Sequence, residues 1–216
     1  MDTDFWHQKW KSNDIGFHQD EYNPQLIKYF NKLKLATGSR VFVPLCGKTL
    51  DIAWLLENNY AVAGVELNEP AVEALFATLG VKPVVSDKEN HRHYQANNLD
   101  IFVGDFFQLT TIDLGSEIGD VDAVYDRAAL VALPTDMRRR YAAHLISLTK
   151  AAPQLLLSFE YDQQAMAGPP FSVTESEIIQ LYGEVFALNR LACFPVEGGL
   201  KGICPADESV WLLQTR

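Results

Sequence analysis

The sequence predicts an α/β fold with a doubly wound, Rossmann-like sheet that is mostly parallel. The first observation is the run over residues 40–66, where an apolar segment, a glycine-containing turn, an amphipathic segment and a second apolar segment follow one another. The second is that short apolar segments keep alternating with helix-like segments further along the chain. Such alternation is typical of parallel strands with helices on both faces of the sheet.

Length and composition favour one domain. We expect a single domain over residues 1–216, because 48% of the residues are hydrophobic and can fill one core. A net charge of −10 opposes binding to a phosphate backbone, so no nucleic-acid partner is expected. Three widely separated cysteines fit neither a disulfide framework nor a C-x-x-C zinc site. No apolar run approaches the roughly 18 residues that a membrane span needs. We expect a cytoplasmic monomer that binds a small molecule.

The first 23 residues form an aromatic arm ahead of the first strand. Trp6 and Trp10 are four residues apart and would share one helix face. The aromatic rings of this arm either dock on the edge of the sheet or cover a ligand, and one arrangement can do both. Asn23 and Pro24 then begin an amphipathic helix over residues 25–35.

The central unit has a strand over residues 40–45, a helix from residue 51 and a second strand that ends at Glu66. Glu66 lies 19 residues after Gly47 (66 − 47), where doubly wound folds place a carboxylate that binds ribose hydroxyls. The alternative is that Glu66 only caps the helix that starts with Asn68, Glu69 and Pro70.

The glycines of this unit separate three ligand classes. A phosphate loop ending in Gly47-Lys48-Thr49 would need glycine where Phe42 stands. The G-x-G-x-x-G pattern of dinucleotide folds is also missing, because Gly47 is the single glycine of the turn. A ligand with a ribose and no phosphates remains, and S-adenosylmethionine is the commonest such cofactor.

Later elements follow the same alternation. We expect a helix over residues 69–79, an irregular stretch over residues 81–98 whose histidines lie in a solvated loop, and a strand over residues 99–103. After this strand, Asp105 could accept a hydrogen bond from an adenine amine while Phe106 or Phe107 stacks on the base. At least one of these two phenylalanines is expected to be an ordinary core residue.

The second half begins with a strand over residues 120–126 and places Arg127 at the crevice. In the helix over residues 135–150, Arg138, Arg139 and Arg140 should form a solvated face. The remaining expected elements are a strand over residues 153–160, a stiff turn over 165–171 that can floor a pocket, a helix over 172–182, and strands over 184–194 and 208–214 joined by a glycine-rich loop.

Several motifs together resemble one family. They are Trp10, Phe17-His18-Gln19, Pro44-Leu45-Cys46-Gly47-Lys48, Gly64-Val65-Glu66, Asp126-Arg127 and Gly168-Pro169-Pro170-Phe171. The chain resembles the thiopurine S-methyltransferase family over nearly its whole length. The family's mammalian members have glycine where this chain has Ala128.

The resemblance implies a seven-stranded class I methyltransferase sheet whose last strands are antiparallel. It places S-adenosylmethionine at Trp10, Leu45, Glu66 and Arg127, with Asp105 and Phe106 at the adenine by position and Phe17 in the thiol-substrate pocket. The implied reaction is S-methylation of small aromatic or heterocyclic thiols without a metal, extended in bacterial members to selenium and tellurium species. A nicotinamide oxidoreductase and a non-catalytic small-molecule sensor are the alternatives.

Overall fold

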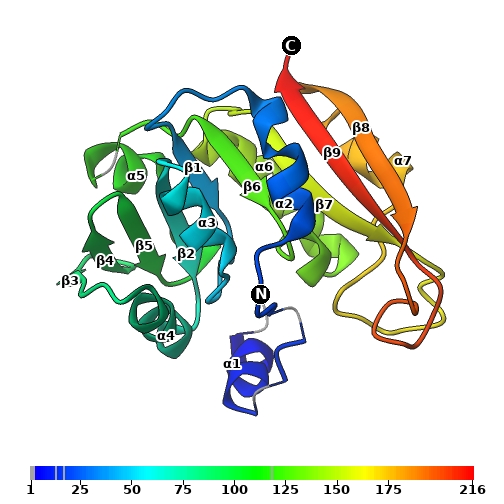
Figure 1. Cartoon of the computed structure of the whole chain (residues 1–216), viewed down its shortest axis with the longest axis horizontal. Helices are drawn as coiled ribbons and strands as arrows, with labels where there is room; N and C mark the ends of the chain where they lie inside the picture. Colours follow the sequence, from blue (N-terminus) through cyan, green and yellow to red (C-terminus); the bar gives the residue numbers. More distant parts are fainter. Residues whose placement is uncertain (1–2, 13, 17, 118) are drawn as a thin grey trace.

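The computed structural model describes residues 3–12, 14–16, 18–117 and 119–216. Over these residues one nine-stranded sheet has the order β3-β4-β5-β2-β1-β6-β7-β9-β8 (Figure 1). The strands are β1 Arg40–Val43, β2 Ala61–Glu66, β3 Val84–Asp87, β4 Arg92–Ala96, β5 Leu99–Val103, β6 Ala123–Asp126, β7 Gln154–Glu160, β8 Phe186–Pro195 and β9 Asp207–Thr215. The five central strands β5, β2, β1, β6 and β7 are parallel, so the predicted α/β class is confirmed.

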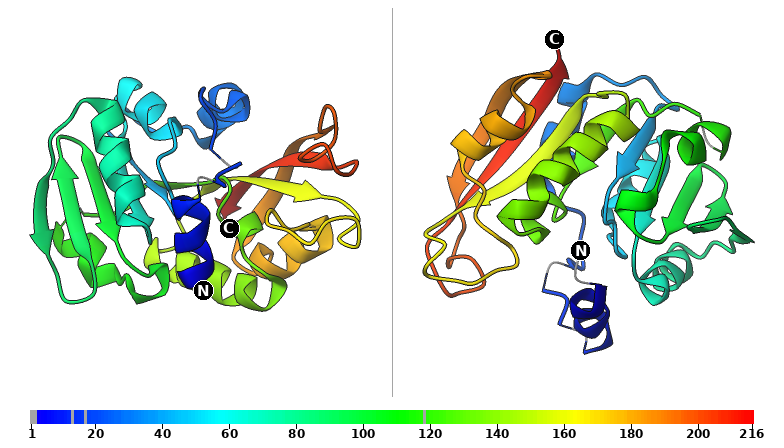
Figure 2. Two further views of the ribbon diagram at one scale, coloured as in Figure 1. Left: turned by 90° about the horizontal axis from the view of Figure 1, so that it is seen from below. Right: turned by 180° about the vertical axis from the view of Figure 1, so that it is seen from behind.

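Helices cover both faces of the sheet. The α-helices are α1 Thr3–Lys11, α2 Pro24–Tyr29, α3 Asp51–Glu57, α4 Glu69–Leu79, α5 Thr111–Glu117, α6 Thr135–Leu148 and α7 Glu175–Tyr182, and short 3₁₀ turns are η1 Phe30–Leu33, η2 Phe106–Gln108 and η3 Leu130–Ala132. Alternating residues of β1 divide between two cores, since Val41 and Val43 pack with α2, α3 and α4 while Phe42 packs with α6 and α7. Figure 2 shows α6 and α7 on the face opposite α2 and α3.

The sheet has two more strands than the seven expected, because residues 81–98 do not form an irregular loop. They form the antiparallel hairpin β3–β4, which continues the sheet beyond β5. The edge strand β3 leaves Val84 71% exposed, so it lacks the apolar alternation by which strands are recognised. His91 and His93 are 4% and 2% exposed, so the expected solvated loop is wrong for both.

Arg138 also differs from the expected solvated face. Its side chain is 3% exposed and lies between α6 and α7. Its Nε donates to Glu177 Oε1 at 2.6 Å and its Nη2 donates to Glu177 Oε2 at 2.9 Å. The Leu133 carbonyl and the Thr135 hydroxyl accept further hydrogen bonds from the guanidinium. The guanidinium therefore joins two helices, whereas Arg139 and Arg140 are exposed as expected.

Candidate active site

The carboxyl ends of β1 and β6 mark the point where the chain changes sides of the sheet. The helix after β1 is α3, which packs with one core, and the helix after β6 is α6, which packs with the other. Ligands of doubly wound folds bind in the crevice at such a switch point. Leu45 follows β1 and Arg127 follows β6, so two of the predicted cofactor residues flank this crevice.

The turn after β1 has an unusual backbone. Leu45 has φ 46° and Gly47 has φ 53°, so two residues of this turn are left-handed. For a branched side chain this conformation costs roughly 1–2 kcal/mol. Backbone strain of this kind is concentrated at ligand-binding sites. The strain at Leu45 therefore indicates a ligand site at the same turn for which the sequence motif predicts one.

Glu66 closes this turn from the end of β2. Its carboxylate is 6% exposed and accepts hydrogen bonds from the Gly47 amide at 2.8 Å and the Asn68 amide at 2.8 Å. Burial raises the pKa of the Glu66 carboxyl, and the backbone amides of Asn68 and Gly47 oppose that rise. Asn68 itself caps α4 by accepting from Ala71. The carboxylate therefore holds two turns together, and it keeps acceptor capacity that a ribose hydroxyl could use.

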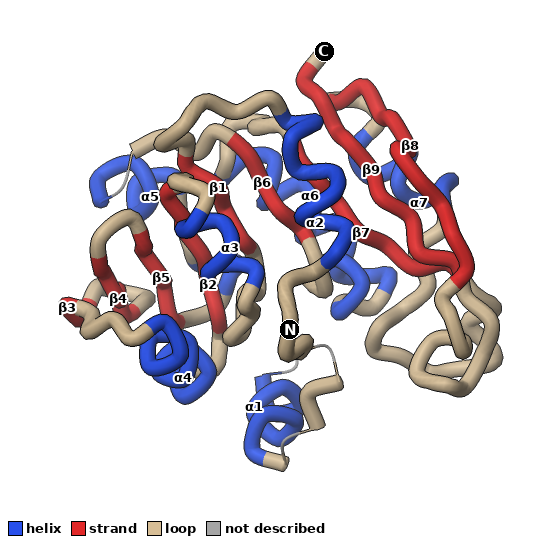
Figure 3. The backbone as a smooth tube through the Cα atoms, in the orientation of Figure 1, coloured by secondary structure: helices blue, strands red, loops and turns tan. Residues whose placement is uncertain are grey.

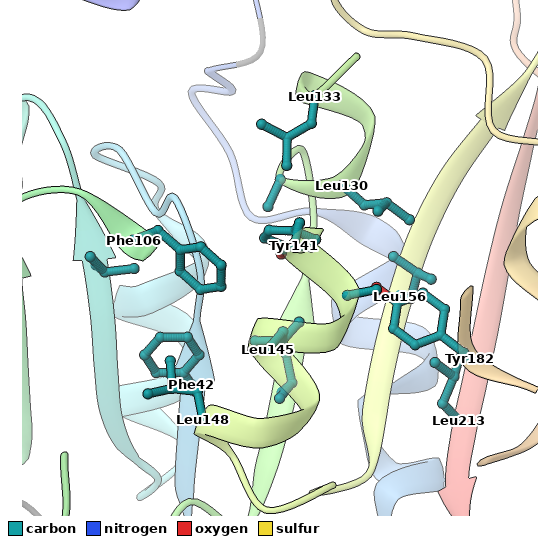
Figure 4. Packing of buried hydrophobic residues seen from close by; sticks show 14 of the residues in the cluster. Phe42, Phe106, Leu130, Leu133, Tyr141, Leu145, Leu148, Leu156, Tyr182 and Leu213 are labelled. Atoms are coloured by element: carbon teal, nitrogen blue, oxygen red, sulfur yellow. The ribbon is translucent and has the colours of Figure 1, made fainter. Parts of the chain in front are cut away.

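The turn after β5 is hydrogen-bonded to the end of β2 at Glu66. The Gly104 amide donates to the Glu66 carbonyl at 2.9 Å. Asp105 is half-buried, and its Oδ1 accepts from the Phe107 amide at 3.0 Å. Phe106 is 1% exposed, and its ring packs against the ring of Tyr141 (Figure 4). The Phe106 ring also meets the His144 ring edge-on. Stacking on a base does not fit Phe106, because its ring belongs to the core.

The turn after β6 depends on a buried acid. Asp126 is fully buried and accepts from the Leu130 amide at 3.1 Å and the Tyr141 hydroxyl at 2.7 Å. Burial raises the pKa of Asp126 to about 6, and both hydrogen bonds oppose the rise. The acid thus fixes the backbone on both sides of Arg127. Ala128 within this turn is left-handed, with φ 61°.

Replacing Ala128 with glycine is expected to raise the free energy of unfolding by about 0.5–1 kcal/mol, because glycine adopts this φ without the Cβ clash. Chemical denaturation measures the change. Ala129→Gly is the matched control: Ala129 has φ −97° and is fully buried, so the same change should destabilise the protein. Equal destabilisation by both variants would contradict the strain at Ala128.

Positive charge gathers around His18 at this edge. Burial lowers the pKa of His18, and the nearby charges of Lys48 and Arg127 lower it further, while Asp20 opposes this lowering. Arg127 also opposes the rise in pKa that burial causes at Glu208. Within the part of the chain that the structure describes, neither Lys48 nor Arg127 forms an ion pair with a carboxylate. This edge of the sheet therefore carries two half-buried cations.

Helix α1 of the N-terminal arm lies beyond the carboxyl ends of the parallel strands (Figures 1 and 3). Trp10 is half-buried in α1. His7 of the same helix contacts Asn68, with 3.3 Å between the His7 Nδ1 and the Asn68 Nδ2. The arm thus reaches the turn that Glu66 holds. Phe17, predicted to line the substrate pocket, lies outside the described residues.

A hollow of about 630 Å³ lies at the carboxyl end of β7, where Tyr161 and the loop between β8 and β9 line it. The Tyr161 hydroxyl donates to the Pro170 carbonyl at 2.7 Å, and Lys201 of that loop donates to the Pro169 carbonyl at 2.8 Å. A Cβ at Gly168 would lie 2.6 Å from the Phe171 ring, so the turn needs glycine there. The residues that line the hollow come neither from the Gly168 turn nor from the turns that Glu66 joins.

In residues 3–12, 14–16, 18–117 and 119–216, no three histidine, cysteine, aspartate or glutamate side chains gather as metal ligands would. None of the helices in this part of the chain has the length and apolarity needed to cross a membrane.

Comparison with known proteins gives a full-length match. The family model described as Thiopurine S-methyltransferase (TPMT) matches residues 1–215. The Thiopurine S-methyltransferase of Xanthobacter autotrophicus is 55% identical over 215 residues and 99% of each chain. That of Acinetobacter baylyi is 48% identical over 221 residues and 100% of each chain.

Solved structures show the same fold at low identity. A TehB-like SAM-dependent methyltransferase from Corynebacterium glutamicum has a TM-score of 0.58 at 12% identity, with 99% of this chain and 98% of that chain covered. Burkholderia thailandensis 1,6-didemethyltoxoflavin-N1-methyltransferase, solved with bound 1,6-didemethyltoxoflavin and S-adenosylhomocysteine, has a TM-score of 0.65 at 17% identity, with 99% and 87% covered.

Proposed function

The chain belongs to the thiopurine S-methyltransferase family, and from that membership we propose that it transfers the methyl group of S-adenosylmethionine to the sulfur of small aromatic or heterocyclic thiols. Its fold is that of the SAM-dependent methyltransferases it matches. The observation that supports the cofactor best is Glu66, a buried carboxylate fixed by two backbone amides at the end of β2. A carboxylate in this place binds ribose hydroxyls in doubly wound folds.

The cofactor would lie across the turns at the carboxyl ends of β1, β2, β5 and β6. We assign the ribose to Glu66, the adenine amine to Asp105, and the remaining contacts to Leu45, Arg127 and Trp10. When bound, the cofactor supplies an electrophilic sulfonium methyl group. The residues of this chain hold and orient it, and α1 of the arm would cover it from the side of Asn68.

The substrate thiol would enter between the arm and the turn at Gly168. The positive charges of Lys48 and Arg127 favour a thiolate over a thiol in this space, because an opposite charge nearby stabilises the ionised form. A thiolate is a strong nucleophile, so orientation toward the methyl group is the main task left to the protein. Phe17 remains our assignment for a ring that lines this pocket.

We also assign the protein to the cytoplasm as a monomer with no nucleic-acid partner. Cys46, Cys193 and Cys204 are all free thiols, which suits a reducing compartment.

Methyl transfer to thiophenol is expected to exceed transfer to phenol by at least about 100-fold, since general-base catalysis contributes 10²–10⁴-fold and the proposed mechanism does without it. A phenol has a pKa near ~10 and must lose its proton during reaction, whereas a thiol near ~8.5 supplies thiolate close to neutral pH. Release of S-adenosylhomocysteine is measured with thiophenol, phenol, catechol and a selenol, each with and without a chelator.

Comparable rates on the oxygen substrates, or loss of activity with the chelator, would contradict the base-free thiolate mechanism. Cofactor binding without turnover on any member of the panel would instead favour the small-molecule sensor.

A further inference from the structure

We propose that His91 and His144 are positioning residues that hold the turn from Asp105 to Leu109 and so determine how selectively the protein recognises the adenine of its cofactor. The inference rests on the proposed function, because it needs the adenine at Asp105. Both histidines lie outside the motifs that identify the family, and each bonds a backbone carbonyl of this turn.

His91 reaches the turn from the β3–β4 hairpin. Its Nε2 lies 3.2 Å from the Asp105 carbonyl oxygen. A carbonyl oxygen only accepts, so the imidazole must carry its proton on Nε2 to make this hydrogen bond. The ring is 4% exposed and meets the Phe102 ring edge-on, with 6.4 Å between the centroids. A Cβ at Gly104 would lie 2.7 Å from the His91 ring, so glycine is what lets the imidazole come this close.

His144 reaches the same turn from α6, which packs on one face of the sheet. Its Nε2 lies 3.0 Å from the Phe106 carbonyl and 3.0 Å from the Leu109 carbonyl. The ring also packs against the Phe106 ring at 4.9 Å with an interplanar angle of 85°. Two imidazoles from separate elements therefore fix three carbonyls of a five-residue turn.

The turn that they fix carries the predicted adenine acceptor. The Asp105 Oδ1 is occupied by the Phe107 amide. No described residue donates to the Asp105 Oδ2, so this oxygen is available to an exocyclic amine. An acceptor prefers adenine to hypoxanthine only while it stays opposite position 6 of the purine, where adenine has an amine and hypoxanthine has a carbonyl. The hydrogen bonds from His91 and His144 to the backbone carbonyls of this turn keep the Asp105 carboxylate in that position.

The test compares S-adenosylhomocysteine with S-inosylhomocysteine, whose base carries the 6-carbonyl, by titration calorimetry. The unchanged protein should bind the adenosyl compound at least about tenfold more tightly, the value of one hydrogen bond to a charged group. His91→Phe keeps the ring against Phe102 but removes the N–H, and should reduce this ratio to below about threefold. His91→Gln restores a donor to the Asp105 carbonyl and should recover much of the ratio. His144→Phe should also lower it.

His93→Phe is the matched control. His93 lies two residues further along the same hairpin, is 2% exposed, and bonds Asp100 at 2.9 Å. The change should lower thermal stability and leave the ratio of the two dissociation constants unaltered. This readout separates positioning from general loss of the hairpin.

The outcomes distinguish the proposed function from the positioning role of His91 and His144. Failure of the unchanged protein to bind S-adenosylhomocysteine overturns the proposed function together with this inference. Tight binding with an undiminished ratio in both His91→Phe and His144→Phe overturns the inference and leaves the function standing. A reduced ratio in His93→Phe as well would show that any damage to the hairpin has the effect, which also overturns it.

Discussion

Replacing Glu66 with glutamine is expected to weaken S-adenosylhomocysteine binding by about 1.5–3 kcal/mol, or roughly 10- to 150-fold, because charge-assisted hydrogen bonds to the ribose are lost. The structure adds a second effect. Both oxygens of Glu66 accept backbone amides, from Gly47 and from Asn68. Glutamine has one acceptor, so its amide nitrogen would face one of these N–H groups. A buried donor left without a partner costs about 1–3 kcal/mol of folding stability.

Titration calorimetry and chemical denaturation measure the two effects separately. Glu69→Gln is the control, because it makes the same change three residues away, where the side chain accepts from Tyr94 at 2.7 Å and lies 32% exposed beside Arg92. It should leave the dissociation constant unchanged and cost less than about 1 kcal/mol of stability. If Glu66→Gln lowers stability but not affinity, then Glu66 only joins the two turns, which is the helix-capping alternative.

Breaking the ion pair between α6 and α7 is expected to cost about 3–5 kcal/mol of folding stability. The variant is Glu177→Ala, which leaves the 3% exposed guanidinium of Arg138 without its carboxylate. Two strong contacts are lost, at 2.6 Å and 2.9 Å. The loss would be seen as an earlier midpoint in urea with an unchanged slope.

Arg139→Ala serves as the control, since this neighbour is exposed and its loss should change stability by no more than about 0.5 kcal/mol. The double variant Arg138→Met with Glu177→Leu should regain much of the stability, because an apolar pair needs no desolvation of charge. A cost below about 1 kcal/mol for Glu177→Ala would mean that water reaches the guanidinium readily.

The sequence predicted best those elements whose cause is local. The strand that ends at Glu66 and the helix that follows Asn68 are both found within a residue or two, because apolar runs, a capping side chain and Pro70 specify them without distant partners. The closing strands, expected over residues 184–194 and 208–214, form β8 and β9.

The failures concern residues whose role is set far along the chain. Arg138 looks solvated beside two other arginines until Glu177, 39 residues away, is brought against it. His91 looks like a loop residue, yet it bonds a carbonyl 14 residues further on. Phe106 and Phe107 are adjacent, and only the packing of α6 decides that Phe106 is the core residue. Polar partners at long range leave no periodic pattern in the sequence.

The order of the last three strands has a consequence for synthesis on the ribosome. β9 follows β8 in the chain, but in the sheet it lies between β7 and β8. β7 pairs with β9 over seven residue positions and β8 pairs with β9, so β8 has no place in the sheet before β9 arrives. As a chain emerges, its earlier segments can fold first. The parallel part of the sheet can therefore form during translation, while β8 waits with its backbone unpaired until residues 207–215 have left the ribosome.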